Sequence, residues 1–192
     1  MDKAFLKDLI KMENIQYFSS RAIKCKELSN FSLHNVIIDN INYPTGEHAF
    51  HGEKFRQLSN YISESPRKEQ LLNYSLKFRE NSLEKKSQMA TPQMAKSAGG
   101  KKGLLLTIIE QEQWNQLAED VQLVICMSKL ELHHDVQKTL LATGDQILIH
   151  SVFRTSLENI KKKEIWGGKY DVSDNIIYGQ NKLGKIWMKL RN

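Results

Sequence analysis

The sequence contains little cysteine and no long apolar run. Its only two cysteines, Cys25 and Cys126, stand alone, without the Cys-x-x-Cys spacing of redox or zinc motifs. We therefore expect reduced thiols and a cytoplasmic protein. No apolar run approaches the roughly 20 residues that span a bilayer. The first residues, MDKAFLKDLIKMEN, alternate charged with apolar side chains, unlike a signal peptide. We expect no membrane partner.

Several motifs for nucleotides, acyl transfer and metals are also missing. The sequence has no Gly-x-Ser-x-Gly elbow and no Walker loop. Residues 97–103, SAGGKKG, lack the Walker spacing and predict a helix stop followed by an exposed basic turn. His48 and His51 are three residues apart, but no third ligand is evident, and zinc sites ordinarily need three or four. We therefore expect no metal.

The composition is that of a soluble globular protein with a basic balance. Hydrophobic residues make up 40% and charged residues 26% of 192 residues, which is enough for one domain with its own core. The 28 Lys and Arg exceed the 22 Asp and Glu, giving a net charge of +6. This excess favours polyanionic partners such as nucleic acid, nucleotides or phosphorylated metabolites. A lysine-rich surface that serves only solubility is the alternative.

The local patterns predict mostly helix with a little strand. Residues 36–38 are β-branched and followed by Asp39-Asn40, which indicates a strand and a turn. Helix starts are indicated at Thr45, Ser65-Pro66 and Thr91-Pro92. Helical spacing predicts further helices over about 108–132, from Asp135 to Gly144, and at the C-terminus, and 146–153 is the clearest strand. Residues 156–175 show no period and predict a loop.

The stretch YPTGEHAFHGEKF, residues 43–55, combines charge with large apolar residues. At about 100° per residue, one arc of about 140° carries Glu47, Phe50, His51, Lys54, Phe55 and Leu58. A charged group on a buried face costs free energy unless it is paired or used. Glu47 is therefore a candidate for chemistry. The alternative is a solvated acid in the first helical turn, favoured there by the helix dipole.

Five motifs, in order, resemble the NADAR family, also called YbiA-like. They are YFSS with LSNFS, the YPTGEHAFHGEKF stretch, LLATGDQILIHS, IWGG, and YGQNKLGKIWMKLR. The resemblance covers residues 15–191 and implies a single compact α+β domain, predominantly helical, with a small β element. We accordingly expect an N-terminal extension over residues 1–14 and a NADAR domain over 15–192.

The resemblance implies N-glycosidase chemistry without a metal or organic cofactor. One branch of the family cleaves early riboflavin-pathway intermediates, which are ribose-phosphate pyrimidines. Another removes ADP-ribose from guanine bases of nucleic acid. The implied partners are thus a small molecule containing ADP-ribose or ribose phosphate, or ADP-ribosylated DNA. The basic balance favours the nucleic-acid substrate.

The resemblance also suggests site residues. A sugar cation formed when the nitrogen leaves needs a carboxylate, and Glu47 is the first catalytic candidate. Trp166 is a further catalytic candidate that could stack on the base or cap the sugar, or only anchor a loop. Lys54 could hold a phosphate, or lie along the surface. The substrate-binding candidates are Tyr17, Ser19, Asn30, Phe31, Lys54 and Asn181, and for both asparagines a turn-stabilising role stays open.

The chain differs from the family pattern at two positions. Ile149-His150 stands where the family usually has an acid after the Thr-Gly strand. Lys163 stands where it has an Asp three residues before the tryptophan, and the adjacent Glu164 is a catalytic candidate in its place. The difference supports a second hypothesis, a non-catalytic binder of ADP-ribose-like nucleotides. A plain basic nucleic-acid-binding module, with affinity that falls steeply with salt, is a third.

Overall fold

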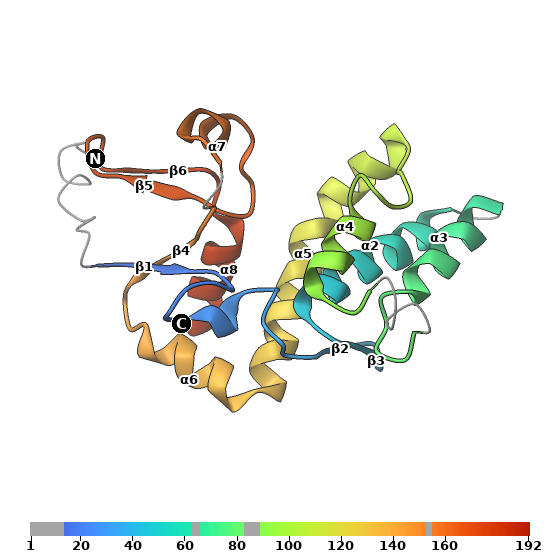
Figure 1. Ribbon diagram of the computed structural model, residues 1–192, viewed down its shortest axis with the longest axis horizontal. Helices are drawn as coiled ribbons and strands as arrows, with labels where there is room; N and C mark the ends of the chain where they lie inside the picture. The colour runs from blue at the N-terminus through green and yellow to red at the C-terminus, as the bar shows by residue number, and fades with distance from the viewer. Residues whose placement is uncertain (1–13, 63–65, 83–88, 153–154) are drawn as a thin grey trace. The chain divides into compact units, whose positions relative to one another are not determined.

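The computed structural model describes residues 14–62, 66–82, 89–152 and 155–192 (Figure 1). The chain forms two compact units: unit 1 comprises the chain up to Ser29 and from Asp135 onward, and unit 2 comprises Asn30–His134. Helices dominate the described residues, and the strands among them form three two-stranded sheets. The predicted α+β, predominantly helical fold class is confirmed. The N-terminal extension lies almost wholly outside the described residues.

Unit 2 is built around one helix, α2 (Gly46–Tyr61), which contacts α3 (Pro66–Leu76), α4 (Pro92–Gly99) and α5 (Ile108–Leu132). The helix starts follow the predicted capping residues. The Thr45 hydroxyl accepts from the backbone N–H of His48, and Thr91 caps α4 in the same way. Thr107 and Glu110 form a capping box at the start of α5. Ser65 lies outside the described residues.

Polar side chains on α2 are buried and paired with one another. Glu53 is 1% exposed, and its carboxylate accepts from the Tyr43 hydroxyl at 2.6 Å. The Arg56 guanidinium donates to both Glu53 oxygens and also pairs with Asp39 at 2.6 Å. A buried charge is tolerated only with such partners. The helix is therefore buried on several sides rather than on the single arc that the sequence indicates.

A β-hairpin precedes α2. Strands β2 (Val36–Ile38) and β3 (Ile41–Tyr43) pair antiparallel, with Ile38 opposite Ile41. The two turn residues, Asp39 and Asn40, have φ of 50° and 62°. Two left-handed residues match the right-handed twist of a tight hairpin, and Asp and Asn tolerate that conformation. The predicted strand and turn are confirmed.

Unit 1 centres on a parallel pair of strands, β1 (Ile15–Phe18) and β4 (Ile147–His150). The C-terminal helix α8 (Lys182–Arg191) packs against β4, and Trp187 on it is fully buried, its indole N–H donating to the Leu28 carbonyl at 2.9 Å. The predicted strand and C-terminal helix are confirmed. A 3-10 turn, η2 (Lys26–Leu28), and helix α6 (His134–Ala142) complete this part of the chain.

The loop predicted over residues 156–175 is wrong. The segment forms helix α7 (Leu157–Lys163) and then strand β5 (Lys169–Asp171), which pairs with β6 (Ile176–Tyr178) (Figure 1). The Ser156 hydroxyl caps α7 by accepting from Asn159 N–H at 3.3 Å. A helix of seven residues has too few apolar positions to show a period. Only Ile160, 1% exposed, is buried in it.

The burial of α3 and the limits of α6 also differ from what the sequence pattern indicates. On α3, Leu71 is fully buried, whereas Leu72 and Leu76 are 40% and 39% exposed. Asp135 does not cap α6 but lies in its first turn, and α6 ends at Ala142, before Gly144. Cys25 and Cys126 are free thiols, as expected. Among the described residues, no helix is both long and apolar enough to cross a bilayer.

Candidate functional site

Three ionisable side chains lie together on one face of α2. Glu47, His51 and Lys54 follow one another at four- and three-residue spacing, and each is 8% exposed. The Glu47 carboxylate lies 3.3 Å from Nε2 of His51. Aromatic rings surround the group: Phe50 packs edge-on against His51, and Trp114 of α5 packs edge-on against Phe50. The predicted functional face is therefore buried.

His51 is held as a neutral donor to Glu47. Burial lowers the pKa of His51 below its ordinary value, against the opposing effect of the Glu47 carboxylate. Its Nδ1 is buried, and no described residue is its hydrogen-bond partner. The single proton therefore belongs on Nε2, from which it is donated to Glu47. This hydrogen bond orients the carboxylate.

Lys54 lies on the same face, and its ammonium has a lowered pKa. Its ammonium donates to the carbonyl of Gly99, at the C-terminal end of α4, and lies 4.6 Å from the centre of the Phe55 ring. Burial lowers the pKa of Lys54 to about 8, and the Glu47 carboxylate opposes this change. Lys54 is thus not a surface lysine: burial lowers its pKa, the Glu47 carboxylate opposes that change, and its ammonium is bound to the C-terminal end of α4.

We expect one lysine of the folded protein to titrate near pH 8. NMR of ¹³Cε-labelled lysines would detect it, and Lys54→Arg would remove that signal and so assign it. Glu47→Gln should move the pKa lower still, because the carboxylate is what opposes burial. The unfolded chain keeps this proton up to about pH 10.5, so the free energy of unfolding should rise from about pH 8 to 10.5. Lysine signals that all titrate near 10.5 would contradict the expectation.

The LSNF segment supports the first turn of α2. The carbonyl of Asn30 accepts from Glu47 N–H at 2.9 Å, and the Asn30 side-chain amide exchanges two hydrogen bonds with Gln122 of α5, at 2.8 and 3.1 Å. A Cβ at Gly46 would lie 2.8 Å from the Asn30 side-chain oxygen, so glycine is needed there. The Asn30 backbone carbonyl therefore positions Glu47, whereas the Asn30 side-chain amide is paired with Gln122.

A second lysine lies beside this group. The Lys96 ammonium, on α4, is 5.4 Å from the centre of the Phe31 ring, and its charge also acts to lower the pKa of His51. The structure therefore brings together four predicted residues, Asn30, Phe31, Glu47 and Lys54, and adds His51 and Lys96. The two cations and one carboxylate give the face a net positive charge, suited to a phosphorylated ligand.

Close packing of His51 against Gly99 depends on the missing side chain. A Cβ at Gly99 would lie 2.1 to 2.6 Å from His51 atoms. We expect Gly99→Ala to lower the free energy of unfolding by about 1–3 kcal/mol, although alanine is the better helix former. Urea unfolding would measure it. The same change in a His51→Ala background should cost less, because the clashing ring is gone; equal costs in both backgrounds would contradict the packing described.

Sequence reasoning missed His51 and Lys96 as site residues for different reasons. His51 shares the arc of Glu47, and its four-residue spacing was the available signal, but it was considered only as a metal ligand with His48. Both ring nitrogens of His48 are engaged, with the Thr45 hydroxyl at 2.8 Å and the Met89 carbonyl at 2.7 Å. Lys96 gives no local signal, because only the packing of α4 on α2 places it here.

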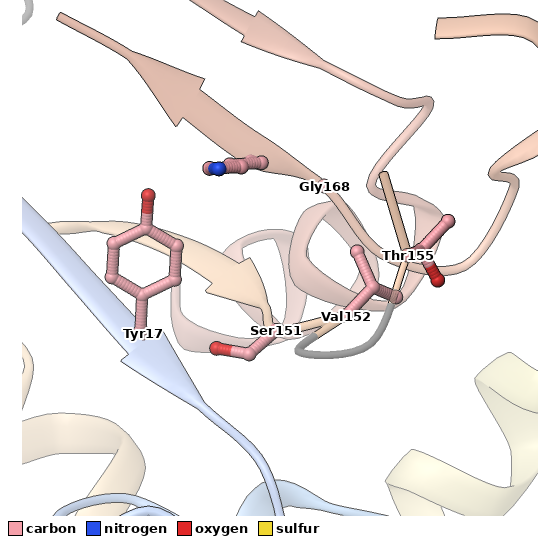
Figure 2. Close-up of a pocket in the computed structure, with 6 residues that line it drawn as sticks. Tyr17, Ser151, Val152, Thr155 and Gly168 are labelled. Atoms are coloured by element: carbon pink, nitrogen blue, oxygen red, sulfur yellow. The ribbon is translucent and has the colours of Figure 1, made fainter. Parts of the chain in front are cut away.

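The remaining five candidates lie in unit 1, where Tyr17 lines a pocket of about 360 Å³ (Figure 2). The pocket is also lined by Ser151, Val152, Thr155, Gly168 and Lys169. The Tyr17 ring rises from β1, and its hydroxyl accepts from Tyr170 N–H at 3.1 Å. The hydroxyl of Ser151 is buried without a hydrogen-bond partner among the described residues. Tyr17 therefore lines a pocket, and its role in substrate binding stays a prediction.

The other four form hydrogen bonds that hold unit 1 together. The Asn181 amide donates to the Leu148 carbonyl and accepts from His150 N–H, at 2.8 and 3.1 Å. The Glu164 carboxylate accepts from Gly167 N–H at 2.7 Å. The Trp166 carbonyl accepts from the first turn of α8, and Ser19 accepts from Arg21 N–H at 3.3 Å. Their roles in substrate binding or catalysis stay predictions.

Comparison with known proteins identifies the family of the chain. The family model of the NADAR domain matches residues 12–192. No curated protein matches the sequence. Among solved structures, the NMR structure of the E. coli protein YbiA is similar over 95% of this chain and 85% of that chain, with a TM-score of 0.57 and 22% sequence identity. At that identity the likeness concerns the fold, which is thus the YbiA fold.

Proposed function

Because the chain belongs to the NADAR family, we propose that it is an N-glycosidase that removes ADP-ribose from guanine bases of nucleic acid. Family membership supports a hydrolase acting on N-glycosyl bonds. The observation that carries the proposal is the buried Glu47 carboxylate, which receives a hydrogen bond from neutral His51 and lies on the same helical face as Lys54. The choice of ADP-ribosylated nucleic acid as the substrate is the more specific part of the proposal.

The proposed reaction breaks the bond between the anomeric carbon and the guanine nitrogen. The departing nitrogen leaves the ribose with positive charge at the anomeric carbon, and a carboxylate stabilises that charge. Glu47 supplies the carboxylate and also takes a proton from the attacking water. The hydroxyl of that water is added to the anomeric carbon, and the proton passes on to the leaving nitrogen. The products are ADP-ribose and intact guanine.

The residues around Glu47 have separate roles in the proposed reaction. His51 orients the Glu47 carboxylate through its Nε2–H. Lys54 and Lys96 offer positive charge to the diphosphate of the ADP-ribosyl group. Phe31, which lies under the Lys96 ammonium, offers an aromatic face to the ribose or the base. Loss of Glu47 should therefore affect the chemical step more than binding.

A nucleic-acid substrate fits the net charge of +6 better than a small pyrimidine does. Hydrolysis of ribose-phosphate intermediates of riboflavin synthesis is the second candidate, since the same carboxylate would serve it. The third is a non-catalytic binder of ADP-ribose-like nucleotides. One observation favours it: Lys163 stands where the family has an acid, and the neighbouring Glu164 carboxylate is engaged by Gly167 N–H.

The test is to incubate the purified protein with single-stranded and duplex DNA that carries ADP-ribosyl-guanine, and to quantify free ADP-ribose by mass spectrometry. We expect release with intact DNA as the second product. A ribose-phosphate pyrimidine in a parallel reaction tests the second candidate. Isothermal titration with ADP-ribose tests the third, which predicts binding without any product. No release from DNA by folded protein would refute the proposed substrate.

A further inference from the structure

A second pocket of unit 1, outside the residues proposed for catalysis, is lined by consecutive lysines. It has a volume of about 490 Å³ and lies between the end of α7 and the turn after β6. We call it the α7 pocket; its lining includes Lys161, Lys162, Lys163, Glu164, Gly179 and Gln180. All three lysines are exposed. The position combines concentrated positive charge with a hollow that a ligand can enter.

The acids around the α7 pocket are already engaged. The Glu164 carboxylate accepts from Gly167 N–H at 2.7 Å, inside its own loop. Glu158 pairs with Lys162 at 2.5 Å, and both side chains are well exposed, so an incoming anion can compete for that lysine. Among the residues that line the pocket, the three lysines outnumber the single acid, Glu164.

One lysine is held in place by an aromatic ring. The Lys161 ammonium lies 3.9 Å from the centre of the Tyr178 ring, close enough for a cation–π interaction. Tyr178 is in turn fixed by its hydroxyl, which donates to Asp174 at 2.5 Å. Three lysines in the last turn of so short a helix also exceed what its dipole requires, since the effect falls off within one turn. An ordered cation at the edge of a hollow is suited to a phosphate group.

We propose that the α7 pocket binds backbone phosphates of a nucleic-acid strand. Lys161, Lys162 and Lys163 contact the phosphates, and release of the counterions condensed on the strand supplies the free energy of binding. The site requires neither ADP-ribose nor a particular base sequence. It goes beyond the proposed glycosidase function and would exist in a protein that lacks that activity.

The test measures binding of a fluorescein-labelled 20-nucleotide single strand, without ADP-ribose, by fluorescence anisotropy over a series of KCl concentrations. The variant is Lys161→Ala/Lys162→Ala/Lys163→Ala. Its matched control, Lys101→Ala/Lys102→Ala/Lys138→Ala, removes the same charge from exposed lysines elsewhere. A third variant changes lysines 161–163 to arginine and keeps the charge. Circular dichroism checks that each variant folds.

We expect the first variant to bind at least tenfold more weakly at low salt, while the control and the arginine variant stay within about threefold of wild type. Loss of three phosphate contacts should reduce the slope of log K against log salt by about 2, at roughly 0.7 per single-strand phosphate. Equal losses in the two alanine variants would overturn the proposal, because binding would then depend only on net charge. Absence of binding by wild type would do the same.

Two further arms separate this site from the glycosidase reaction. Isothermal titration with ADP-ribose should give the same affinity for wild type and the first variant; a loss confined to ADP-ribose would show that the pocket holds its diphosphate instead, and would overturn the proposal. Release of ADP-ribose from the ADP-ribosyl-guanosine nucleoside should also be unchanged in the first variant. Failure of wild type to release ADP-ribose from both the nucleoside and the ADP-ribosylated DNA would refute the proposed function and leave the binding result intact.

Discussion

Replacement of Glu47 by Gln is expected to lower kcat for release of ADP-ribose by about 10³-fold, a magnitude typical of a lost general base or acid. Glutamine has nearly the same shape, but it brings neither a negative charge to the ribose cation nor a site for the proton of water. KM should change little, because Lys54 and Lys96 remain to attract the phosphates. Steady-state kinetics on the ADP-ribosylated strand, with mass spectrometry as readout, would measure both constants.

The control for Glu47→Gln is Glu112→Gln, which removes one negative charge from an exposed position of α5. It should leave kcat within twofold of wild type. Glu47→Gln should also keep its affinity for ADP-ribose in isothermal titration, which separates lost chemistry from lost binding. If kcat instead falls by less than about tenfold in folded Glu47→Gln protein, the carboxylate is not part of the chemical step.

Replacement of Glu53 by Ala is expected to destabilise the fold by about 3–5 kcal/mol, the cost of leaving a buried charge without its partner. Glu53 is 1% exposed and accepts from the Tyr43 hydroxyl, Arg56 and Gln57. Its removal leaves the largely buried Arg56 guanidinium with Asp39 as its one remaining ion-pair partner among the described residues, and leaves the fully buried Tyr43 without its acceptor. Urea unfolding followed by circular dichroism would give the free energy.

The matched control for Glu53→Ala is Glu158→Ala. Glu158 also pairs with a basic residue, Lys162 at 2.5 Å, but its side chain is 75% exposed. Exposed pairs contribute less than about 1 kcal/mol, so this variant should unfold close to wild type. Similar unfolding free energies for both variants would contradict the buried network. We thus propose different roles for the two glutamates of α2, Glu47 in chemistry and Glu53 in stability, and kinetics and unfolding distinguish the two roles.

Elements that carry strong local signals were predictable from the sequence. Helix α5 has 25 residues, a capping threonine and a repeated apolar period, so its limits follow from local chemistry. The Asp39-Asn40 turn needs two left-handed residues, which the sequence supplies. Helix α7 was missed because seven residues cannot show a period. Strands β5 and β6, of three residues each, depend on pairing with one another rather than on their own composition.

The candidate site was predictable only in part, because some of its properties depend on burial and packing rather than on local sequence. Glu47, His51 and Lys54 share a face of α2 by helical spacing alone, and the motifs of the NADAR family could be read from residue order. The role of His51 as a neutral donor could not, because it depends on burial and on the absence of a side chain at Gly99. The pKa of about 8 for Lys54 could not be predicted from the sequence either, because it results from burial of the ammonium.

The sequence by itself determined the family, the helix-rich class, the capping residues that begin the helices, and the face of α2 that carries the carboxylate. These depend on residues close together in the chain or on motif order. The tertiary structure decided which of the two α2 glutamates is engaged in a buried ion network, which histidine is available to Glu47, and which lysines surround it. Those properties depend on contacts between residues as far apart as Asn30 and Gln122, since burial and pairing are set only when distant segments pack together.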